Sequence, residues 1–467
     1  MFRRTLLPAL AAVTMLSSCT DAPVPTGLRV RKPNLTANLV TVAGPTILTT
    51  VYQNTVTYAF GMNALGDAVA TIGAAGVDHA VRWPAASAMG IEIDMAGASA
   101  ADINVSGQIA GEVPNPQEVV DPKAVLWTPT GNGTYQTTEV ADQLLSVTEH
   151  HVSAINDYGQ VVGYVWGPIL GHKCFLWTPT SPNATTGTAM FLRDLGGSDC
   201  RAYDINSDGY VVGTSNVGGG SESHAFLWSP TTPNGTTGTT QDLTPNGGSS
   251  EAHAINDARQ IGGWRDPGGG PIQGVIWTPL KGGGFSPMYL GDGVYVNGIN
   301  NSGYAAGLIW KVAPTYDGDA YFWQNGVLTN LPGTMGHAGA TAMSDTYGSV
   351  VHVAGFSKAG PSARGGNFGQ RWDVTVTPLV LFWPLAAIDQ GVNQLRSNGT
   401  LSDREARAVL GKVDGIARLL DQGQSVPACY LANAVKAQLT LLVRTRRLTN
   451  EQAQPLIDLA ENAVSCR

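Results

Sequence analysis

A run of oxygen-bearing side chains begins at Asp204 and matches the first half of a calcium-binding loop. The run reads Asp-x-Asn-x-Asp-Gly, so side-chain oxygens alternate along a tight turn, as cation coordination requires. The twelfth position of such a loop, where a bidentate glutamate completes the ligand set, is Ser215. The corresponding segment fifty residues later has Ala254 and Ala258 in place of the two aspartates. We therefore expect no metal site here and interpret the run as the turn of a repeat.

The remaining polar residues form no recognisable catalytic motif. His150 and His151 are adjacent, and neighbouring side chains on a strand point to opposite faces, so the pair is poorly placed to share one metal ion. The sequence contains no nucleophile elbow, no HExxH, no P-loop and no CxxC. We therefore expect a protein that is not an enzyme and that needs no cofactor. A site assembled from several repeats would leave no such motif and stays open.

The 11 tryptophans fall into two groups. Seven recur once per repeat and are expected to be core residues between sheets. They are Trp83, Trp127, Trp177, Trp228, Trp277, Trp323 and Trp383. The other four do not follow the repeat, and we interpret them as loop aromatics that are candidates for ligand binding. They are Trp166, Trp264, Trp310 and Trp372.

A short repeat organises most of the chain. Its clearest copy runs from Ala202 through Ile205-Asn206 to Gly213, and a His-Ala-Phe-Leu-Trp segment follows at 224–228. The Ile/Met of the Ile-Asn pair recurs at steps of 41 to 52 residues. The seven positions are Met62, Ile103, Ile155, Ile205, Ile255, Ile299 and Met343.

Each copy can be divided into four short strands. Ala-x-x-Ile ends a strand, Asn-x-x-Gly forms a turn capped by the asparagine side chain, and Val-Val-Gly begins the return strand. The His-Ala-Phe-Leu-Trp segment is a third strand, and the Asp-Leu-Gly stretches are assigned to the fourth. Four strands per unit of about 45 residues are typical of a propeller blade. We therefore predict a mainly β fold with a seven-bladed β-propeller over residues 40–384.

Two copies depart from the pattern. The fifth has Arg259 where the turn glycine is expected, and the seventh has Ser344-Asp345 in place of asparagine. We expect the turns of these blades to differ. The repeat resembles that of the bacterial extracellular HAF-repeat family, which is named for a His-Ala-Phe run such as 224–226. The resemblance covers about residues 40–384 and implies an exported protein with tandem repeats.

The pattern changes after Trp383 to a helical period. Ser402-x-x-Glu405 and Thr449-x-x-Gln452 are capping boxes, which place helix starts next to them. We predict a small α-helical domain over residues 385–467, with helices near 385–397, 403–421, 426–446 and 450–464. This region resembles the small helical modules of secreted bacterial enzymes and adhesins, which implies an accessory role.

The N-terminus carries an export signal. Arg3 and Arg4 precede a short apolar run that is too short to span a bilayer. The segment ends in Leu-Ser-Ser-Cys, which resembles the lipobox of bacterial lipoproteins and implies that Cys19 is lipidated. We predict a signal peptide at 1–18 and a lipidated tether at 19–39. The chain would then be exported and anchored to the cell envelope, at the outer membrane if the cell is Gram-negative, on the periplasmic side or at the surface.

The other four cysteines fit an oxidising compartment, where two disulfides are expected. Proximity in the sequence favours Cys174–Cys200 and Cys429–Cys466 among the three possible connectivities. The net charge is −8, which argues against a nucleic-acid partner held through phosphates. The expected contacts are therefore the membrane, through the lipid, and a glycan or an envelope protein. We expect a monomer.

Three functions are compatible with these features. The first is a non-enzymatic binding or scaffold module displayed at the cell envelope. The second is a carbohydrate-active hydrolase or lyase whose carboxylates converge near the propeller axis. The third is a purely structural envelope spacer. Convergent carboxylates or a histidine cluster in the central channel would favour the enzyme, whereas an apolar or glycine-lined channel would count against it.

Overall fold

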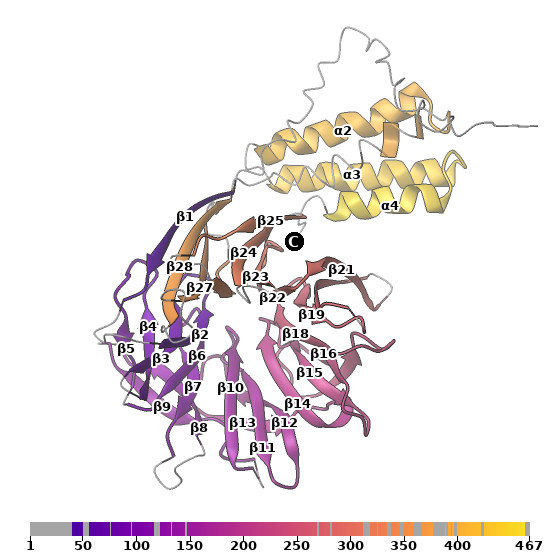
Figure 1. Cartoon of the computed structure of the whole chain (residues 1–467). Coiled ribbons are helices and arrows are strands. Elements are labelled where there is room, and N and C mark those ends of the chain that lie inside the picture. The colour runs from indigo at the N-terminus through magenta and orange to yellow at the C-terminus, as the bar shows by residue number, and fades with distance from the viewer. Residues whose placement is uncertain are drawn as a thin grey trace, which may run out of the picture. The chain divides into compact units, whose positions relative to one another are not determined.

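The computed structural model describes residues 40–462 apart from short gaps, the longest of which are 359–366 and 377–387. Figure 1 shows seven four-stranded antiparallel sheets arranged radially around a central axis, which is the seven-bladed β-propeller that the repeat predicts. The predicted signal peptide 1–18 and tether 19–39, with Cys19, lie outside the described residues.

Each blade is a four-stranded meander whose first strand lies nearest the axis. Blade 1 is β2–β5, blade 2 is β6–β9, blade 3 is β10–β13, blade 4 is β14–β17, blade 5 is β18–β21, blade 6 is β22–β25, and blade 7 is β26–β28 with β1. The strands are β1 Val40–Ile47, β2 Val56–Met62, β3 Ala68–Ala74, β4 Val77–Trp83, β5 Ile91–Glu92, β6 Ser99–Ile103, β7 Ile109–Val113, β8 Lys123–Pro129, β9 Tyr135–Glu139, β10 Glu149–Ile155, β11 Val161–Gly167, β12 Gly171–Pro179, β13 Gly187–Phe191, β14 Gly196–Ile205, β15 Val211–Val217, β16 Ser223–Pro230, β17 Gly238–Asp242, β18 Ser250–Ile255, β19 Ile261–Arg265, β20 Gln273–Pro279, β21 Phe285–Asp292, β22 Val294–Ile299, β23 Ala305–Trp310, β24 Gly318–Gln324, β25 Val327–Asn330, β26 Ala338–Met343, β27 Val350–Lys358 and β28 Asn367–Val376.

The ring is closed by the first described strand. β1 pairs antiparallel with β28, so the outermost strand of blade 7 comes from the N-terminal side of the propeller. Val40 lies opposite Val376, which brings the two ends of the propeller segment together. This pairing covers an edge of β28 that would otherwise expose unpaired backbone groups.

The predicted turn is present, and the fifth copy keeps it. The N–H of Gly209 donates to the carbonyl of Asn206, and the N–H of Arg259 donates to that of Asn256 at 2.9 Å. Arg259 adopts a φ of 60°, the left-handed conformation that glycine provides elsewhere, so this turn does not differ as expected. In the seventh copy, the N–H of Ser344 bonds to the carbonyl of His352, so that turn is longer.

Two strand assignments need correction. The fourth strand of blade 3 is β13, which ends at Phe191, so the stretch starting at Asp194 connects two blades instead of forming the fourth strand. In blade 7 the repeat tryptophan is Trp372, because it pairs with Val353 as Trp228 pairs with Val211 in blade 4. Trp372 is fully buried and is therefore a core residue, not a loop aromatic. Trp383 lies outside the described residues.

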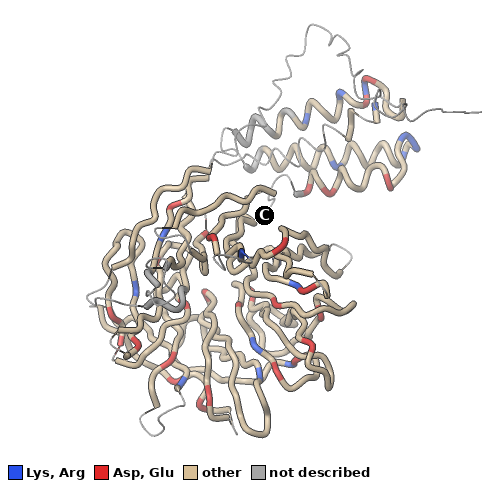
Figure 2. Tube along the Cα trace, in the orientation of Figure 1, with Lys and Arg blue, Asp and Glu red and all other residues tan. Residues whose placement is uncertain are grey.

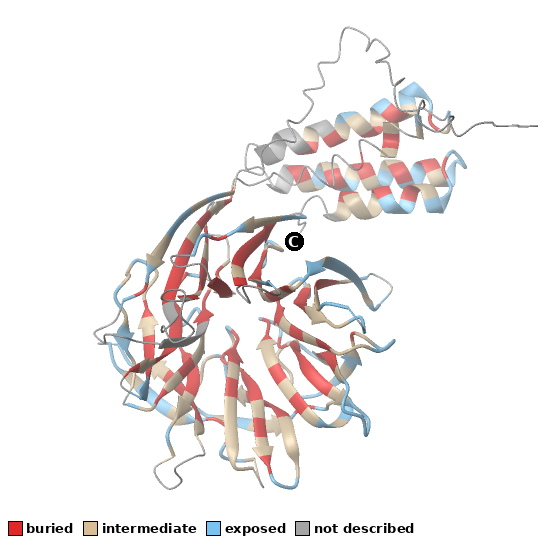
Figure 3. Cartoon of the chain, viewed as in Figure 1, coloured by how far each residue is buried: buried red, intermediate tan, exposed pale blue. Residues whose placement is uncertain are grey.

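The core consists of apolar layers between neighbouring blades. The repeat tryptophans of blades 1–5 are at most 2% exposed, which confirms their assignment as core residues. Figure 3 shows buried residues along the inner strands, whereas outermost strands such as β9 and β21 have only exposed and intermediate positions. Figure 2 shows acidic and basic residues distributed around the ring.

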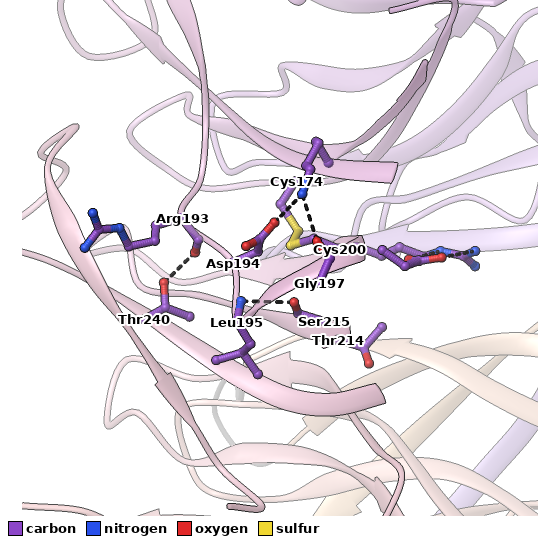
Figure 4. Close-up of a disulfide and its surroundings, with 12 residues drawn as sticks. Cys174, Arg193, Asp194, Leu195, Gly197, Cys200, Thr214, Ser215 and Thr240 are labelled. Carbon is purple, nitrogen blue, oxygen red and sulfur yellow. Dashed lines mark hydrogen bonds and ion pairs between the residues drawn. A yellow bond between two sulfur atoms is a disulfide. The ribbon is translucent and has the colours of Figure 1, made fainter. Parts of the chain in front are cut away.

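A disulfide joins two blades. Cys174 in β12 of blade 3 and Cys200 in β14 of blade 4 are bonded, with their Cα atoms 5.2 Å apart, as predicted. Figure 4 shows this bond beside Asp194 and Gly197 in the connection between the blades. The Lys173 ammonium donates to Asp194 and to the carbonyl of Gly197. Both cysteines are fully buried in an apolar cluster between the two blades.

The C-terminal region is helical, as predicted. Its described helices are α2 Asp403–Asp421, α3 Ser425–Arg444 and α4 Asn450–Asn462, and several residues within 388–396 are also helical. Both capping boxes form: the N–H of Ser402 donates to Glu405 at 2.8 Å, and that of Thr449 donates to Gln452 at 3.0 Å. The predicted Cys429–Cys466 pairing involves Cys466, which lies outside the described residues. No helix within the described part of the chain is long and apolar enough to cross a membrane.

Candidate functional site

The turn asparagines form a ring around one end of the propeller axis. Within a blade, the side-chain oxygen of Asn206 accepts from the N–H groups of Asp208 and Tyr210, which caps the turn. Its amide N–H donates to the carbonyl of the next asparagine, Asn256, at 3.1 Å. Six such links connect consecutive blades from Asn63 through Asn104, Asn156, Asn206, Asn256 and Asn300 to Ser344.

The sequence pattern predicts the cap but not the link between blades. Ser344 occupies the seventh position, and its hydroxyl donates to the carbonyl of Asp345 within its own turn. Blade 7 therefore makes no equivalent side-chain link toward blade 1 among the described residues. The ring of links is therefore open between the turn of blade 7 and that of blade 1.

A second set of polar side chains surrounds this end of the channel. Each follows a turn asparagine and accepts a hydrogen bond from the backbone of the preceding blade. Asp157 accepts from the N–H of Val105 at 3.0 Å, and Asp257 accepts from that of Ser207 at 3.1 Å. Asn301 bridges the carboxylates of Asp257 and Asp345, at 2.9 Å from each. This end of the channel is therefore acidic, and its oxygens already serve contacts between blades.

Two carboxyl groups lie deeper in the channel. The channel has an outer half, which the turn asparagines line, and an inner half, which the first strands of the blades line. Asp102 and Asp204 line both halves, and the inner half has a volume of about 170 Å³. Asp102 accepts from the N–H of Ile155 at 3.0 Å, and Asp204 accepts from that of Ile255 at 2.7 Å. The other blades have glycine or alanine at this position, such as Gly61 and Ala154, so they contribute no carboxyl group there.

Burial changes the protonation of these two carboxyl groups. It raises the pKa of Asp102 to about 8, and the nearby charge of Asp204 contributes in the same direction. Burial likewise raises the pKa of Asp204 to about 6. At neutral pH the channel therefore holds Asp102 mainly in its neutral form and Asp204 mainly ionised. Two carboxyl groups in the central channel are the feature that would favour an enzyme.

A cluster of aromatic and charged side chains surrounds Tyr164 in β11. The His151 ring lies 4.7 Å from the Tyr164 ring, and the His172 ring lies 5.7 Å away in an edge arrangement. The guanidinium of Arg201 is 5.3 Å from the centre of the same ring, which is a cation–π contact. The Asp199 carboxylate contacts the Nε of Arg201 at 3.2 Å and the Nδ1 of His172 at 3.1 Å. We call His151, Tyr164, His172, Asp199 and Arg201 the Tyr164 cluster.

Carboxylates set the charge of His151. Glu112 from blade 2 lies 3.5 Å from its Nδ1, and Glu149 lies 3.7 Å from its Nε2. The hydrogen bond with Glu112 raises the pKa of His151, whereas desolvation lowers that of its neighbour His150. The two adjacent histidines thus have different environments, as their opposite orientations predict. All members of the cluster are partly exposed, so a ligand can reach them.

The same arrangement continues into blade 5. Tyr203 stacks on His253 with ring centres 4.8 Å apart and an interplanar angle of 9°, and both line the channel. His253 pairs with Glu251 at 2.8 Å. Trp264 lies opposite Glu251 in the sheet and meets Tyr295 of blade 6 edge-on at 6.2 Å. Aromatic rings and ion pairs thus line the inner strands from blade 3 to blade 6.

Two of the four predicted binding tryptophans lie beside these residues. Trp166 pairs with Glu149 and His172, so its side chain shares a face with theirs, and Trp264 occupies in blade 5 the position of Tyr164 in blade 3. Trp310 is 40% exposed at the end of β23 and takes no part in the cluster. All three lie on second strands instead of loops. Trp372 is buried and cannot contact a ligand directly.

From the sequence, Asp204 and His151 were considered only as metal ligands, and the other polar residues near the axis were not identified. They occupy alternate positions before the repeat isoleucine, where blades 3–5 have His151, Arg201 and Glu251. A comparison of this position across the copies could have found them. Blades 3–5 have charged or polar side chains there, whereas blade 7 has Gly339, so the position is not required to be polar by the repeat. In the described part of the chain, no group of three or more His, Cys, Asp or Glu side chains could hold a metal ion.

Several solved propellers are similar to this chain in fold. The β-propeller domain of the Trilobed protease from Pyrococcus furiosus is 11% identical, with a TM-score of 0.44 and coverage of 72% of this chain and 98% of that one. A catalytically inactive virginiamycin B lyase from Staphylococcus aureus with quinupristin is 11% identical, with a TM-score of 0.43 and coverage of 71% and 99%. TolB from Acinetobacter baumannii is 11% identical, with a TM-score of 0.35 and coverage of 64% of this chain and 76% of that one. No protein-family model and no curated protein matches the chain.

Proposed function

We propose that this protein is a non-enzymatic binding module of the cell envelope and that the Tyr164 cluster binds a glycan. One observation carries the proposal: partly exposed aromatic rings and charged hydrogen-bonding groups gather on one part of a regular ring, in blades 3–5. Sugars are recognised by aromatic faces that stack on their C–H surfaces and by planar polar groups that bond to their hydroxyls. Tyr164, Trp264, Arg201 and the neighbouring carboxylates provide both kinds of group.

Binding measurements on two variants test this proposal. Tyr164→Ala and Trp264→Ala should each weaken binding of oligosaccharides or purified peptidoglycan at least about tenfold, because a buried aromatic contact contributes on the order of 1–2 kcal/mol. Tyr430→Ala is the matched control, since Tyr430 is 74% exposed on α3. If the wild-type protein binds none of these ligands, or if both variants bind them as tightly as the control, the glycan-binding proposal is wrong.

We further propose that the protein is a lipoprotein of the HAF-repeat type, anchored through Cys19. The export signal and the repeat motif support this, and the Cys174–Cys200 disulfide is compatible with an oxidising compartment. In the native cell, Cys19→Ser should move the protein from the membrane fraction to the soluble fraction. Mass spectrometry of the wild-type N-terminus should find an acylated cysteine. An unmodified Cys19 in the mature protein would contradict the proposal.

A glycoside hydrolase is the second candidate, and the carboxyl pair in the channel favours it. A neutral Asp102 beside an ionised Asp204 has the protonation states that acid–base hydrolysis of a glycosidic bond requires. Release of reducing ends from the glycans that bind would support this function, provided that Asp102→Asn abolishes the release. Binding without turnover by the wild-type protein would exclude it in favour of the first proposal.

A further inference from the structure

A groove separates the outermost strands of blades 4 and 5, away from the channel. It has a volume of about 340 Å³, the size of a small saccharide-binding pocket. One wall is β21, whose residues Phe285, Pro287 and Tyr289 alternate along the strand and therefore share one face. The other wall runs along the end of β17 and the connection that follows it, with Gln241 and Asn246. The groove thus combines an aromatic wall with a polar one.

Blade 5 differs from blades 3 and 4 at a position that lines this groove. In blades 3 and 4 the outermost strand begins at Gly187 and Gly238, which pair with the proline after the core tryptophan. A Cβ at either glycine would lie 2.5 Å from the indole of Trp177 or Trp228, so the strand packs directly on the tryptophan. Blade 5 has Phe285 at this position, and its partly buried side chain packs against the cluster that contains Trp277 and lines the groove.

The groove contains a cation that is not neutralised. The guanidinium of Arg265 lies 5.1 Å from the centre of the Tyr289 ring and donates to its hydroxyl at 2.7 Å. Asp242 is the carboxylate that lines the groove, and it is bound by His224 at 2.8 Å. Arg265 has no ion pair among the described residues, so most of its N–H donors stay available on one wall. Tyr289 is 47% exposed beside it.

We infer that this groove is a second binding site and that its ligand is an acidic saccharide, such as a uronic-acid unit of a glycan. The carboxylate of the sugar would bond to the Arg265 guanidinium, whose fork geometry matches it. The sugar ring would lie against Tyr289 and Phe285, and the side-chain amides of Gln241 and Asn246 would bond to its hydroxyls. The inference does not depend on glycan binding by the Tyr164 cluster.

Calorimetry with two matched ligands tests the inference. Tri-galacturonate carries the required carboxylates, and its methyl ester has nearly the same shape without the charge. The wild-type protein should bind the acid at least about fivefold more tightly than the ester, and added salt should reduce this preference. Arg265→Gln should remove the preference, and Tyr289→Ala should weaken both ligands. Met288→Ala is the control, because Met288 lies on the opposite face of the same strand and is 41% exposed.

Two outcomes overturn the inference, and a third supports it. Equal binding of the acid and the ester, or no binding of either, would exclude an acidic saccharide. Loss of binding in Tyr164→Ala with full binding in Arg265→Gln would place the ligand in the Tyr164 cluster, which supports the proposed function and rejects the groove. Binding that Tyr289→Ala weakens but Tyr164→Ala leaves intact would support the groove alone.

Discussion

A single asparagine in six of the seven repeat units stabilises both its own turn and the contact with the next blade. Asn206 accepts two backbone hydrogen bonds within its own turn and donates one to the next blade. The same side chain is therefore needed both for the hairpin and for the ring. It is 4% exposed, so water cannot replace these bonds if the amide is removed.

Asn206→Ala should lower the free energy of unfolding by about 1–3 kcal/mol, because it leaves buried donors and an acceptor without partners. Denaturant unfolding followed by tryptophan fluorescence measures this change. Asn246→Ala, which changes an exposed asparagine, is the control and should have little effect. An equal loss in both variants would show that the ring of links contributes nothing specific.

Asp102 should make stability depend on pH. Its pKa rises from the ordinary value of 3.8 to about 8 on folding, so the folded protein holds one more proton than the unfolded chain between these values. Stability from this group is therefore fully present below about pH 4 and is lost as the pH rises toward 8.

Measurements of the unfolding midpoint between pH 5 and 8 test this expectation. Asp102→Asn keeps the hydrogen-bond acceptor but cannot ionise, so its midpoint should fall less steeply with pH than that of the wild type. Asp208→Asn changes an exposed aspartate and should keep the wild-type slope. Identical slopes for the wild type and Asp102→Asn would show that Asp102 does not control the pH dependence.

At the level of strands and helices, local patterns predicted most of the structure correctly. The turn, the three inner strands of a blade and both capping boxes depend on residues a few positions apart, which the sequence shows directly. The seventh blade was misread because its turn is longer, which moves the repeat tryptophan to Trp372. Arg259 was expected to alter its turn, yet the surrounding hydrogen bonds keep it in the glycine conformation.

The Cys174–Cys200 disulfide should stabilise the contact between two blades. It closes a segment with a sequence separation of 26 residues. The double variant Cys174→Ala/Cys200→Ala should therefore lose about 3 kcal/mol, as the entropy of the unfolded chain predicts. Thermal unfolding with and without reductant measures this: reductant should destabilise the wild type more than the variant. Equal effects of reductant on both proteins would contradict a stabilising role.

For the whole molecule, closure of the ring depends on one strand from the other end of the propeller segment. β1 supplies the outermost strand of blade 7, and the ring of asparagine links is open between blades 7 and 1. The closing strand completes the outer edge of blade 7, whereas the missing link lies near the axis. This arrangement makes β1 more important for stability than its length suggests.

A chain that starts at Leu48 lacks β1 and should unfold at a midpoint at least about 10 °C lower than a chain that starts at Val40. It should also self-associate, because the exposed edge of β28 offers unpaired backbone groups to another chain. Calorimetry and size-exclusion chromatography check the two effects. A monomer with an unchanged midpoint would show that β1 is dispensable for closure.

The sequence alone determined the number of blades, the three inner strands of a regular blade and the change to helices after the propeller. These features follow from short-range periods in residue type. Only the tertiary structure decided which polar residues converge. Glu112 meets His151 between two blades, and Asp102 and Asp204 line one channel, because ring closure brings together residues that are far apart in the chain. The run at Asp204 that first suggested calcium binding thus provides a channel carboxylate and a turn.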